Sequence, residues 1–95
     1  MNIYVDIDNT ICTTNGLDYK NANPIIDNIK KINELFNENH ITYWTARGSV
    51  SKKNYYDLTY NQLKSWGCKF HHLSVGEKPP YDLLICDKTK RIEEL

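Results

Sequence analysis

Asn2-Ile3-Tyr4-Val5-Asp6 and the turn Ile7-Asp8-Asn9-Thr10 that follows it form the stretch around which this chain is organised. The apolar, β-branched residues predict a buried parallel strand, and acidic residues come where that strand ends. Open α/β sheets bind their ligands at the carboxyl ends of their strands. We therefore expect a site at this edge, to which the rest of the chain brings further groups.

Asp6 and Asp8 are two residues apart, so in extended backbone both side chains project to one side while Val5 and Ile7 point into the packing. Two carboxylates this close repel each other unless a cation lies between them or one of them holds a proton. A hard cation such as Mg²⁺ takes oxygen ligands and keeps waters that leave room for a phosphate oxygen. The pair predicts a metal ion, a split in acid strength, or both. The alternative is a turn in which Asp8 and its neighbours satisfy local backbone donors.

The composition narrows the classes of function. The chain has 95 residues, which predicts a single domain spanning 1–95. Its 12 basic and 12 acidic residues cancel, so no overall field favours nucleic acid or a membrane surface. Cys12, Cys68 and Cys86 are odd in number and lack CxxC spacing, which indicates reduced thiols and a cytoplasmic protein. The sequence has neither a secretory leader pattern nor an apolar run of membrane-spanning length.

Strands and helices are expected to alternate along the chain. An Asn15-Gly16 turn between 11–14 and 17–19 predicts a tight hairpin, which would form a small flap over the acidic edge. Asn23-Pro24 should open a helix, with the proline in its first turn, that ends near 37–40.

The second half of the chain continues this alternation. The order implies an α/β three-layer sandwich: a parallel sheet of about four strands, right-handed crossovers, and helices on both faces. The carboxyl ends of the first, second and fourth strands would then share one rim. The expected elements are a strand at 41–45, a helix from Ser51 to Trp66, a strand at 69–73, a strand at 82–86 and a short final helix or tail at 88–95.

Four signals fall where a strand ends or just before one begins. They are Asp6 and Asp8 in DIDNT, Thr45 in YWTARG, Lys78 in EKPP, and Asp87 in LLICDK. Their order resembles the haloacid dehalogenase (HAD) superfamily, whose motifs are an Asp-x-Asp, a Ser or Thr, a Lys, and acids after the fourth strand. The resemblance covers nearly the whole chain. TARG and KPPYDLLICDK look more narrowly like small capless phosphatase-like members of polysaccharide biosynthesis.

The resemblance implies a HAD-like Rossmannoid fold and a Mg²⁺-dependent phosphomonoester phosphatase. Asp6 would attack the phosphorus to form an aspartyl-phosphate, while Asp8 would protonate the leaving oxygen and then accept a proton from water. Thr45 and Lys78 would hold the phosphoryl oxygens. By the same resemblance, Mg²⁺ would be bound by Asp6, Asp87 and the backbone carbonyl of Asp8.

Each of these residues also has a structural interpretation. Thr45 ends a strand of β-formers and could serve packing alone. Lys78 could be a solvated loop charge, and Asp87 could form a surface pair with Lys88. Arg47 is expected as a further substrate contact, because its fork binds two oxygens; otherwise it is an exposed loop residue. His40, His71 and His72 lack metal-site spacing and are read as structural or surface groups.

Two departures from the superfamily pattern bear on function. Cys86 precedes Asp87, and Arg91 follows where a second acid would stand. A thiol is a poor Mg²⁺ ligand, so we expect weak metal affinity and slow or absent turnover. The alternative function is therefore a catalytically weak or inactive relative that binds phosphate or a partner. Glycosyltransferase-like and receiver-domain readings are disfavoured by length and by the lack of a central acceptor Asp.

The absence of a cap insertion bears on the substrate. The segments 11–22 and 73–77 are too short to hold a cap domain, and an uncapped site cannot enclose a small molecule unaided. We expect a bulky phosphorylated substrate, such as a sugar phosphate or glycan, or a lid supplied by a partner subunit in a homo-oligomer. Tyr19, Tyr55 and Tyr56 are the candidate contacts.

Overall fold

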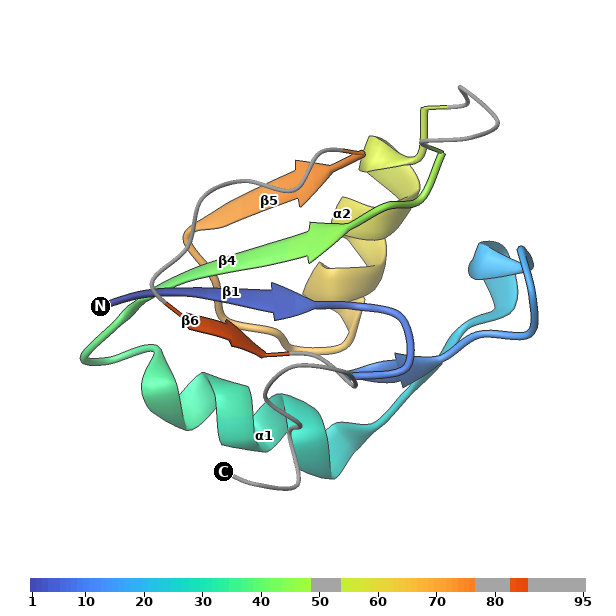
Figure 1. The fold of residues 1–95 in the computed structure, drawn as a ribbon. Coiled ribbons are helices and arrows are strands. Elements are labelled where there is room, and N and C mark those ends of the chain that lie inside the picture. The colour runs from blue at the N-terminus through green and yellow to red at the C-terminus, as the bar shows by residue number, and fades with distance from the viewer. Residues whose placement is uncertain (49–53, 77–82, 86–95) are drawn as a thin grey trace.

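The computed structural model describes residues 1–48, 54–76 and 83–85, which form an α/β domain (Figure 1). Four strands make one parallel sheet in the order β5-β4-β1-β6. Strand β1 (Asn2–Asp6) lies between β4 (His40–Thr45) and β6 (Leu83–Ile85), and β5 (His72–Val75) pairs with the other edge of β4. The prediction of a parallel sheet of about four strands is confirmed.

The burial of β1 alternates as its sequence pattern requires. Ile3 and Val5 are fully buried, whereas Tyr4 and Asp6 on the opposite face are half-buried. Ile7, just past the strand, is also fully buried, as predicted. The acidic residues thus emerge from a strand whose apolar face is anchored in the core.

Two helices complete the core. In α1 (Ile26–Leu35), Ile29 and Ile32 are buried three residues apart, as an amphipathic stripe predicts. In α2 (Tyr56–Ser65), the buried positions are Thr59 and Leu63. The apolar members of both helices join one cluster with the buried residues of β1 and β4.

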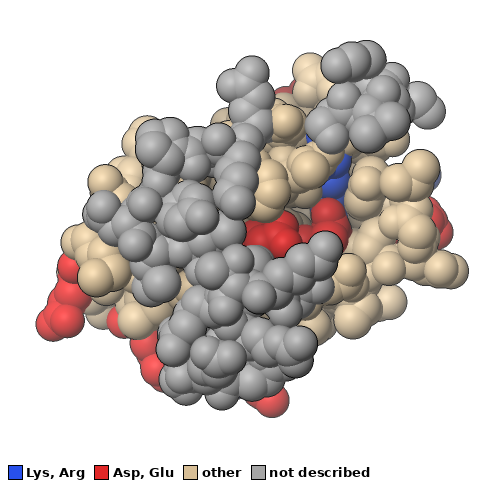
Figure 2. All heavy atoms as spheres, viewed as in Figure 1, with Lys and Arg blue, Asp and Glu red and all other residues tan. Residues whose placement is uncertain are grey.

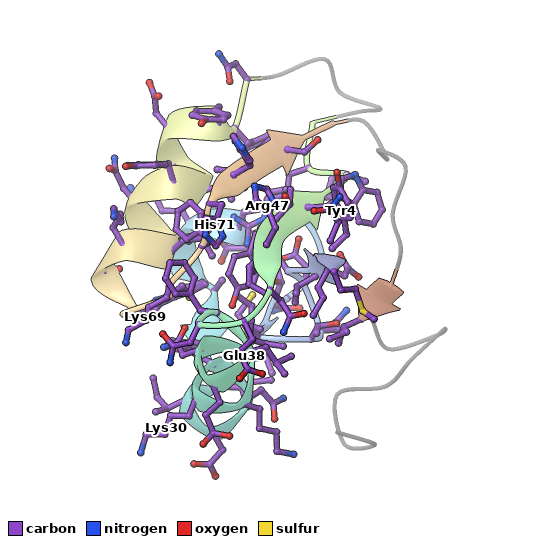
Figure 3. The ribbon with its side chains drawn as sticks, turned by 90° about the vertical axis from the view of Figure 1, so that its left-hand side faces the viewer. Tyr4, Lys30, Glu38, Arg47, Lys69 and His71 are labelled. Carbon is purple, nitrogen blue, oxygen red and sulfur yellow. The ribbon has the colours of Figure 1, made fainter. Side chains whose placement is uncertain are left out.

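Both helices lie on the same face of the sheet (Figures 1 and 3). The chain steps from β1 to β4 and on to β5 in one direction, so two crossovers of the usual right hand put α1 and α2 on one side. The expectation of helices on both faces is therefore wrong for the described helices, which make a two-layer arrangement. The predicted element at 88–95 lies outside the described residues.

The flap differs from the predicted hairpin. Strand β2 (Cys12–Thr13) pairs antiparallel with β3 (Asn23–Pro24), not with 17–19. The turn at Asn15-Gly16 does form, because the Asp18 N–H donates to the Asn15 carbonyl at 3.1 Å, but it does not join paired strands. The chain returns through a short 3₁₀ helix, η1 (Tyr19–Asn21). The flap is consequently a longer loop closed by a two-residue ribbon.

The first helix begins later than predicted. Pro24 belongs to β3, and the Ile25 N–H donates to the Ile11 carbonyl at 2.8 Å, which keeps this segment extended. The Asn28 side chain donates to the Thr10 carbonyl at 2.9 Å and ties the helix to the turn after β1. The helix therefore starts at Ile26, two residues after the proline that was predicted to lie in its first turn.

The third strand is shifted toward the carboxyl end. The prediction placed it at 69–73, but β5 runs over His72–Val75. His71 instead binds β4 through both backbone and side chain: its N–H donates to the Ile41 carbonyl at 2.8 Å, and its Nδ1 accepts the Ile41 N–H at 3.1 Å. A side chain thus takes the place of a strand carbonyl, which a strand pattern does not reveal.

The remaining boundaries agree with the sequence within a few residues, except the start of α2, which was predicted at Ser51 and lies five residues later. Helix α2 ends at Ser65, one residue before the predicted end, and starts at Tyr56, where the Asn54 Oδ1 accepts the Tyr56 N–H at 2.9 Å. The predicted cap, Ser51, lies outside the described residues. In the described part of the chain, neither helix has the length and apolar character needed to cross a membrane.

Candidate active site

The candidate site lies at the carboxyl ends of β1 and β4. Asp6 closes β1, Asp8 follows two residues later, and Thr45 closes β4. These strands are adjacent and in register, with Asp6 opposite Trp44. On the face shown in Figure 2, acidic side chains gather near the centre with basic atoms beside them. The sheet topology therefore brings three predicted site residues to a common edge.

Asp8 is paired with Arg47. The Arg47 Nε donates to Asp8 Oδ2 at 3.0 Å, and an Arg47 Nη donates to Asp8 Oδ1 at 2.7 Å. This two-point pairing is the strong geometry for a guanidinium and a carboxylate. The Arg47 side chain is completely buried and that of Asp8 is 21% exposed. The ion pair thus joins two loops that are 39 residues apart in sequence.

Arg47 has no N–H left for another partner in this arrangement. A guanidinium carries five N–H donors. Besides the two contacts to Asp8, Arg47 donates to Thr59 Oγ1 at 3.1 Å and Gln62 Oε1 at 2.6 Å, and lies 4.0 Å from the Cys12 Sγ. The alternative of an exposed loop residue is wrong for Arg47, which is 2% exposed. Its use as a substrate contact stays a prediction, and would require it to exchange a partner.

Two lysines elsewhere in the domain, Lys30 and Lys69, contrast with Arg47. In Figure 3 the side chains of Lys30 and Lys69 point outward from the body of the domain, whereas Arg47 lies inside it. Both lysines are exposed. A buried arginine stays charged and needs a partner, so its position is set by Asp8 and the polar side chains of α2.

Three further side chains donate to the Asp8 carboxylate. The Thr14 hydroxyl, from the flap, donates to Oδ1 at 2.7 Å, and the Thr45 hydroxyl donates to Oδ2 at 3.2 Å. The Cys12 thiol is 3.6 Å from Oδ1. Oδ1 therefore has donors from the flap and from Arg47, and Oδ2 has donors from Thr45 and Arg47. This arrangement goes well beyond a turn that satisfies local backbone donors.

These donors keep Asp8 ionised. Burial by itself raises the pKa of the Asp8 carboxyl, but hydrogen bonds from Arg47, Thr14 and Thr45 and the charge of Arg47 outweigh it, so the pKa is lowered below 3.8. The neighbouring Cys12 is affected in the opposite sense. Burial and then the Asp8 charge raise the pKa of the Cys12 thiol to about 11, which keeps it protonated and unsuited as a nucleophile.

A second layer of contacts ties the flap to α2. The Gln62 side chain accepts from Arg47 and donates its Nε2 to the Tyr19 carbonyl at 2.6 Å. The Tyr19 ring lies 4.8 Å from the Arg47 guanidinium carbon and meets the Tyr55 ring edge-on at 5.1 Å. Gln62 and Arg47 therefore hold the flap, through Tyr19, next to the Asp8–Arg47 pair.

Asp6 is the predicted nucleophile. Its Oδ1 accepts the Ile7 N–H at 2.9 Å, and its side chain is half-buried at the end of β1. That hydrogen bond orients the carboxylate relative to its own strand. The predicted nucleophile is thus held at the sheet edge by the backbone that follows it.

Two predicted site residues, Lys78 and Asp87, lie outside the described residues, as do Cys86 and Arg91. In the described part of the chain, no group of three or more His, Cys, Asp or Glu side chains is arranged to hold a metal ion. Both Asp8 carboxylate oxygens are occupied by donors, so only the backbone carbonyl of Asp8 would serve as a ligand, as the resemblance implied. The described donors of the expected site, Asp6 and that carbonyl, are hard oxygens of the type that Mg²⁺ prefers.

Several members of this network were not selected from the sequence. Thr14, Thr59 and Gln62 carry no motif, and Gln62 is a half-buried residue on the same helix face as Thr59. One signal was present: Thr59 lies one helical turn before the apolar Leu63, on the face of α2 that is buried, and a buried hydroxyl needs a partner. That partner is Arg47.

A pocket adjoins the network. Its volume is about 390 Å³, and it lies where β4 and β5 end and α2 begins. The residues that line it are Arg47, Gly48, Asn54, Tyr55, Tyr56, Val75 and Gly76. Two of the three tyrosines predicted to contact substrate therefore line a real hollow, while Tyr19 packs between Tyr55 and Arg47.

Comparisons of the chain with protein-family models, with curated proteins and with solved structures found no match. Any functional conclusion therefore rests on the residues and their geometry.

Proposed function

We propose that the chain is a HAD-like, Mg²⁺-dependent phosphohydrolase that cleaves phosphomonoesters through an aspartyl-phosphate on Asp6. One observation supports this more than any other. Thr45 and Asp8, which belong to two separate motifs, meet through a hydrogen bond of 3.2 Å across 37 positions of sequence. They meet at the end of the strand that carries Asp6. The motif order would predict such a meeting, and packing alone would not require it.

In the proposed reaction, an Asp6 oxygen attacks the phosphorus in line. A P–O bond to Asp6 forms as the P–O bond to the leaving group breaks, and the leaving oxygen departs as an anion that takes its proton from water. Water then attacks the phosphorus, and Asp8 accepts its proton. The P–O bond to Asp6 breaks, so that inorganic phosphate is released and Asp6 is regenerated. The Thr45 hydroxyl, which donates to Asp8 in the structure, would turn to the phosphoryl group and orient it.

The residues of the rim would also hold the metal. Asp6, the backbone carbonyl of Asp8, and Asp87 would bind Mg²⁺, which when bound offsets the negative charges of phosphate and carboxylate. Lys78 would add a second positive charge. Arg47 has a different role in this proposal: it neutralises Asp8 from within the fold and so limits repulsion between Asp8 and the substrate.

The ionised state of Asp8 shapes the proposal. A carboxylate held by Arg47 and two hydroxyls has no proton to give to the leaving group, and its lowered pKa also makes Asp8 a weaker base toward water. Substrates whose leaving oxygen departs without full protonation should react fastest.

The same feature favours a second candidate function, a catalytically weak relative that binds phosphate or a phosphorylated partner. In that case the Asp8–Arg47 pair has a structural role, and Thr45 contributes to phosphate binding without turnover. Turnover separates the two candidates, because both share the same pocket and rim.

The test is hydrolysis of 4-nitrophenyl phosphate by the purified chain with Mg²⁺. We expect Asp6→Asn to lower kcat by at least about 1,000-fold, since it removes the nucleophile. Asp57→Asn is the matched control, because Asp57 is an exposed acid in the first turn of α2 and should leave kcat unchanged. Equal rates for wild type and Asp6→Asn would reject the phosphohydrolase. Absent turnover with measurable binding of inorganic phosphate would favour the second candidate.

A further inference from the structure

The pocket beside Arg47 is joined directly to the candidate site. The Gly76 N–H donates to the Thr45 carbonyl at 2.7 Å, and the Thr45 hydroxyl donates to Asp8. Thr45 is therefore hydrogen-bonded both to Gly76 of the pocket wall and to the Asp8 carboxylate. A phosphoryl group held at the rim would place its ester oxygen and leaving group toward this hollow.

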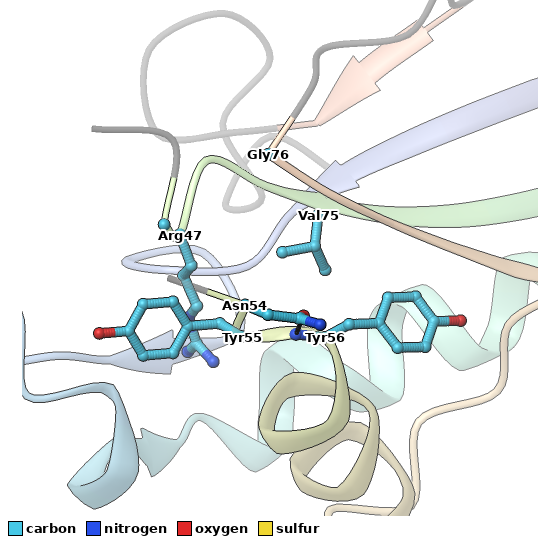
Figure 4. A pocket seen from close by; sticks show the side chains of 7 residues that line it. Arg47, Asn54, Tyr55, Tyr56, Val75 and Gly76 are labelled. Carbon is cyan, nitrogen blue, oxygen red and sulfur yellow. Dashed lines mark hydrogen bonds between the residues drawn. The ribbon is translucent and has the colours of Figure 1, made fainter. Parts of the chain in front are cut away.

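Among the described residues, the lining is mostly aromatic or small, and it contains one charged side chain. Figure 4 shows Tyr55 and Tyr56 on opposite sides of Asn54, with Val75 across from them. Arg47 is the charged residue of the lining, and its guanidinium N–H groups are all directed to other side chains of the protein. The described walls thus offer no free charge to a ligand.

The glycines keep one side of the pocket open. Gly48 and Gly76 have φ values of +82° and +97°, which L side chains rarely adopt. A Cβ built at Gly76 would have no heavy atom within 4 Å, so the space beside it is unfilled. A ligand ring can approach the backbone there, with the Asn54 amide nearby to bind a ring substituent.

We propose that this pocket binds the leaving group of the phosphomonoester and selects an uncharged ring, as in an aryl or glycosyl phosphate. The inference rests on the proposed function. Aromatic walls bind the faces of both ring types, while a charged or ringless leaving group gains no partner from them. The pocket therefore supplies the ring contacts that a capless site otherwise lacks.

The first test measures binding without turnover. Amide NMR signals of the full chain are followed, without Mg²⁺, during titration with 4-nitrophenyl phosphate, glucose 1-phosphate and glycerol 2-phosphate. We expect the two ring-bearing probes, or one of them, to shift Gly48, Val75 and Gly76, and the ringless probe to shift only signals around Asp8 and Thr45. The probe with the larger pocket shifts identifies the ring type. Equal pocket shifts from glycerol 2-phosphate, or none from either ring, would overturn the proposal.

The second test uses a matched pair of variants. Tyr56 and Tyr60 are exposed residues of α2, 42% and 38%, whose rings stack on each other at a centroid distance of 6.3 Å, but Tyr56 alone of the two lines the pocket. Tyr56→Ala should raise KM for the preferred ring substrate about five-fold with kcat unchanged, and Tyr60→Ala should not. Equal changes in KM would overturn the pocket assignment.

Failure of the proposed function would look different. In that case no probe shifts the signals around Asp8 and Thr45 and no phosphomonoester is hydrolysed. Titration with phenol and methyl glucoside then tests the pocket alone. Shifts at Gly48, Val75 and Gly76 would support ring binding, and unshifted signals would overturn it.

Discussion

The two ends of the parallel sheet gather polar side chains but treat charge in opposite ways. At the carboxyl end, Asp8 and Arg47 both stay charged because each is surrounded by partners of the right kind. At the amino end, the His40 ring lies against His71 and His72, with ring centroids 4.6 and 4.9 Å apart. Partial burial, and then the neighbouring histidines and the N-terminal amine, lower the pKa of His40. One end stabilises charge and the other suppresses it.

The difference lies in hydrogen bonding more than in burial. The carboxyl end is the more buried of the two, yet it holds an ion pair, since Thr14, Thr45, Thr59 and Gln62 supply a partner for each charged atom. The amino end is more exposed, with His71 and His72 both open to solvent, but like groups face each other there. We therefore expect a reaction in which charge develops or moves to take place at the carboxyl end of the sheet.

The largest effect should come from removing the buried cation. Arg47→Met leaves the Asp8 carboxylate without its main partner in a largely buried place, which should lower the free energy of unfolding by about 3–5 kcal/mol. Urea denaturation measures the change.

A double variant sharpens this prediction. Asp8→Asn combined with Arg47→Met removes both charges, and should be less destabilised than Arg47→Met alone by at least about 1 kcal/mol. Lys69→Met, at an exposed position, is the control and should change stability little. A double variant that is as unstable as the sum of its single variants would show that the pair is not coupled.

The second effect concerns the leaving group. With Asp8 ionised, the rate should depend steeply on how easily the leaving oxygen departs, because the general acid is missing in the first step. We expect kcat/KM for 4-nitrophenyl phosphate to exceed that for phenyl phosphate by about 100-fold at neutral pH. Both substrates carry the same kind of ring, so the pocket is not what separates them. Similar rates would indicate that Asp8 donates a proton after all.

A smaller effect should follow from removing the Gln62 hydrogen bonds that tie the flap to α2. Gln62→Leu leaves one Arg47 N–H without its partner and removes one of the two hydrogen bonds that the Tyr19 carbonyl accepts, which should cost about 1–3 kcal/mol of stability. Gln62→Glu restores an acceptor for Arg47 but not the donor for Tyr19, and should recover part of the loss. If Gln62→Leu were as stable as wild type, the flap would not be held through this residue.

The smallest effect should appear at the amino end. Because the folded-state pKa of His40 lies below its usual 6.5, the unfolded chain binds protons first as the pH falls. Stability should therefore decline as the pH drops below 6.5 and level off below the folded-state pKa of His40.

Asp8 acts in a lower pH range. Its contribution to the free energy of unfolding is fully present above pH 3.8 and is lost as the pH falls through its lower folded-state pKa.

NMR titration of the histidine rings provides the measurement. We expect the His40 midpoint below 6.5 in wild type and closer to it in His72→Gln, which removes one neighbour that disfavours the charge. A His40 midpoint above 6.5 would show that this end stabilises charge as well, and the contrast between the two ends would fail.

The sequence was sufficient for the elements that carry a clear period. The β1 pattern and the Ile29 and Ile32 stripe of α1 gave the sheet edge and its covering helix, because apolar alternation depends on local burial. The sequence was not sufficient where contacts between distant segments determine which strands pair. Strand β2 pairs with β3 and not with the segment after Asn15-Gly16. The hydrogen bond from the Ile25 N–H to the Ile11 carbonyl, next to both strands, holds this pairing in place.

The site was predicted in part for the same reason. Asp8 and Thr45 were placed correctly at one rim because strand ends and topology determine their position. The burial of Arg47 was missed, because a loop arginine beside a glycine gives no local sign that α2 will present Thr59 and Gln62 to it. The side of the sheet taken by α2 could have been inferred, since both crossovers run in one direction.

The most direct test of the proposed chemistry is to trap the intermediate. Rapid mixing with 4-nitrophenyl phosphate and Mg²⁺, followed by borohydride reduction and peptide mass spectrometry, converts an aspartyl-phosphate to homoserine. The account predicts homoserine at position 6 in wild type and none in Asp6→Asn. Hydrolysis that proceeds with Asp6 unmodified, or with the label at Asp8 instead, would contradict it.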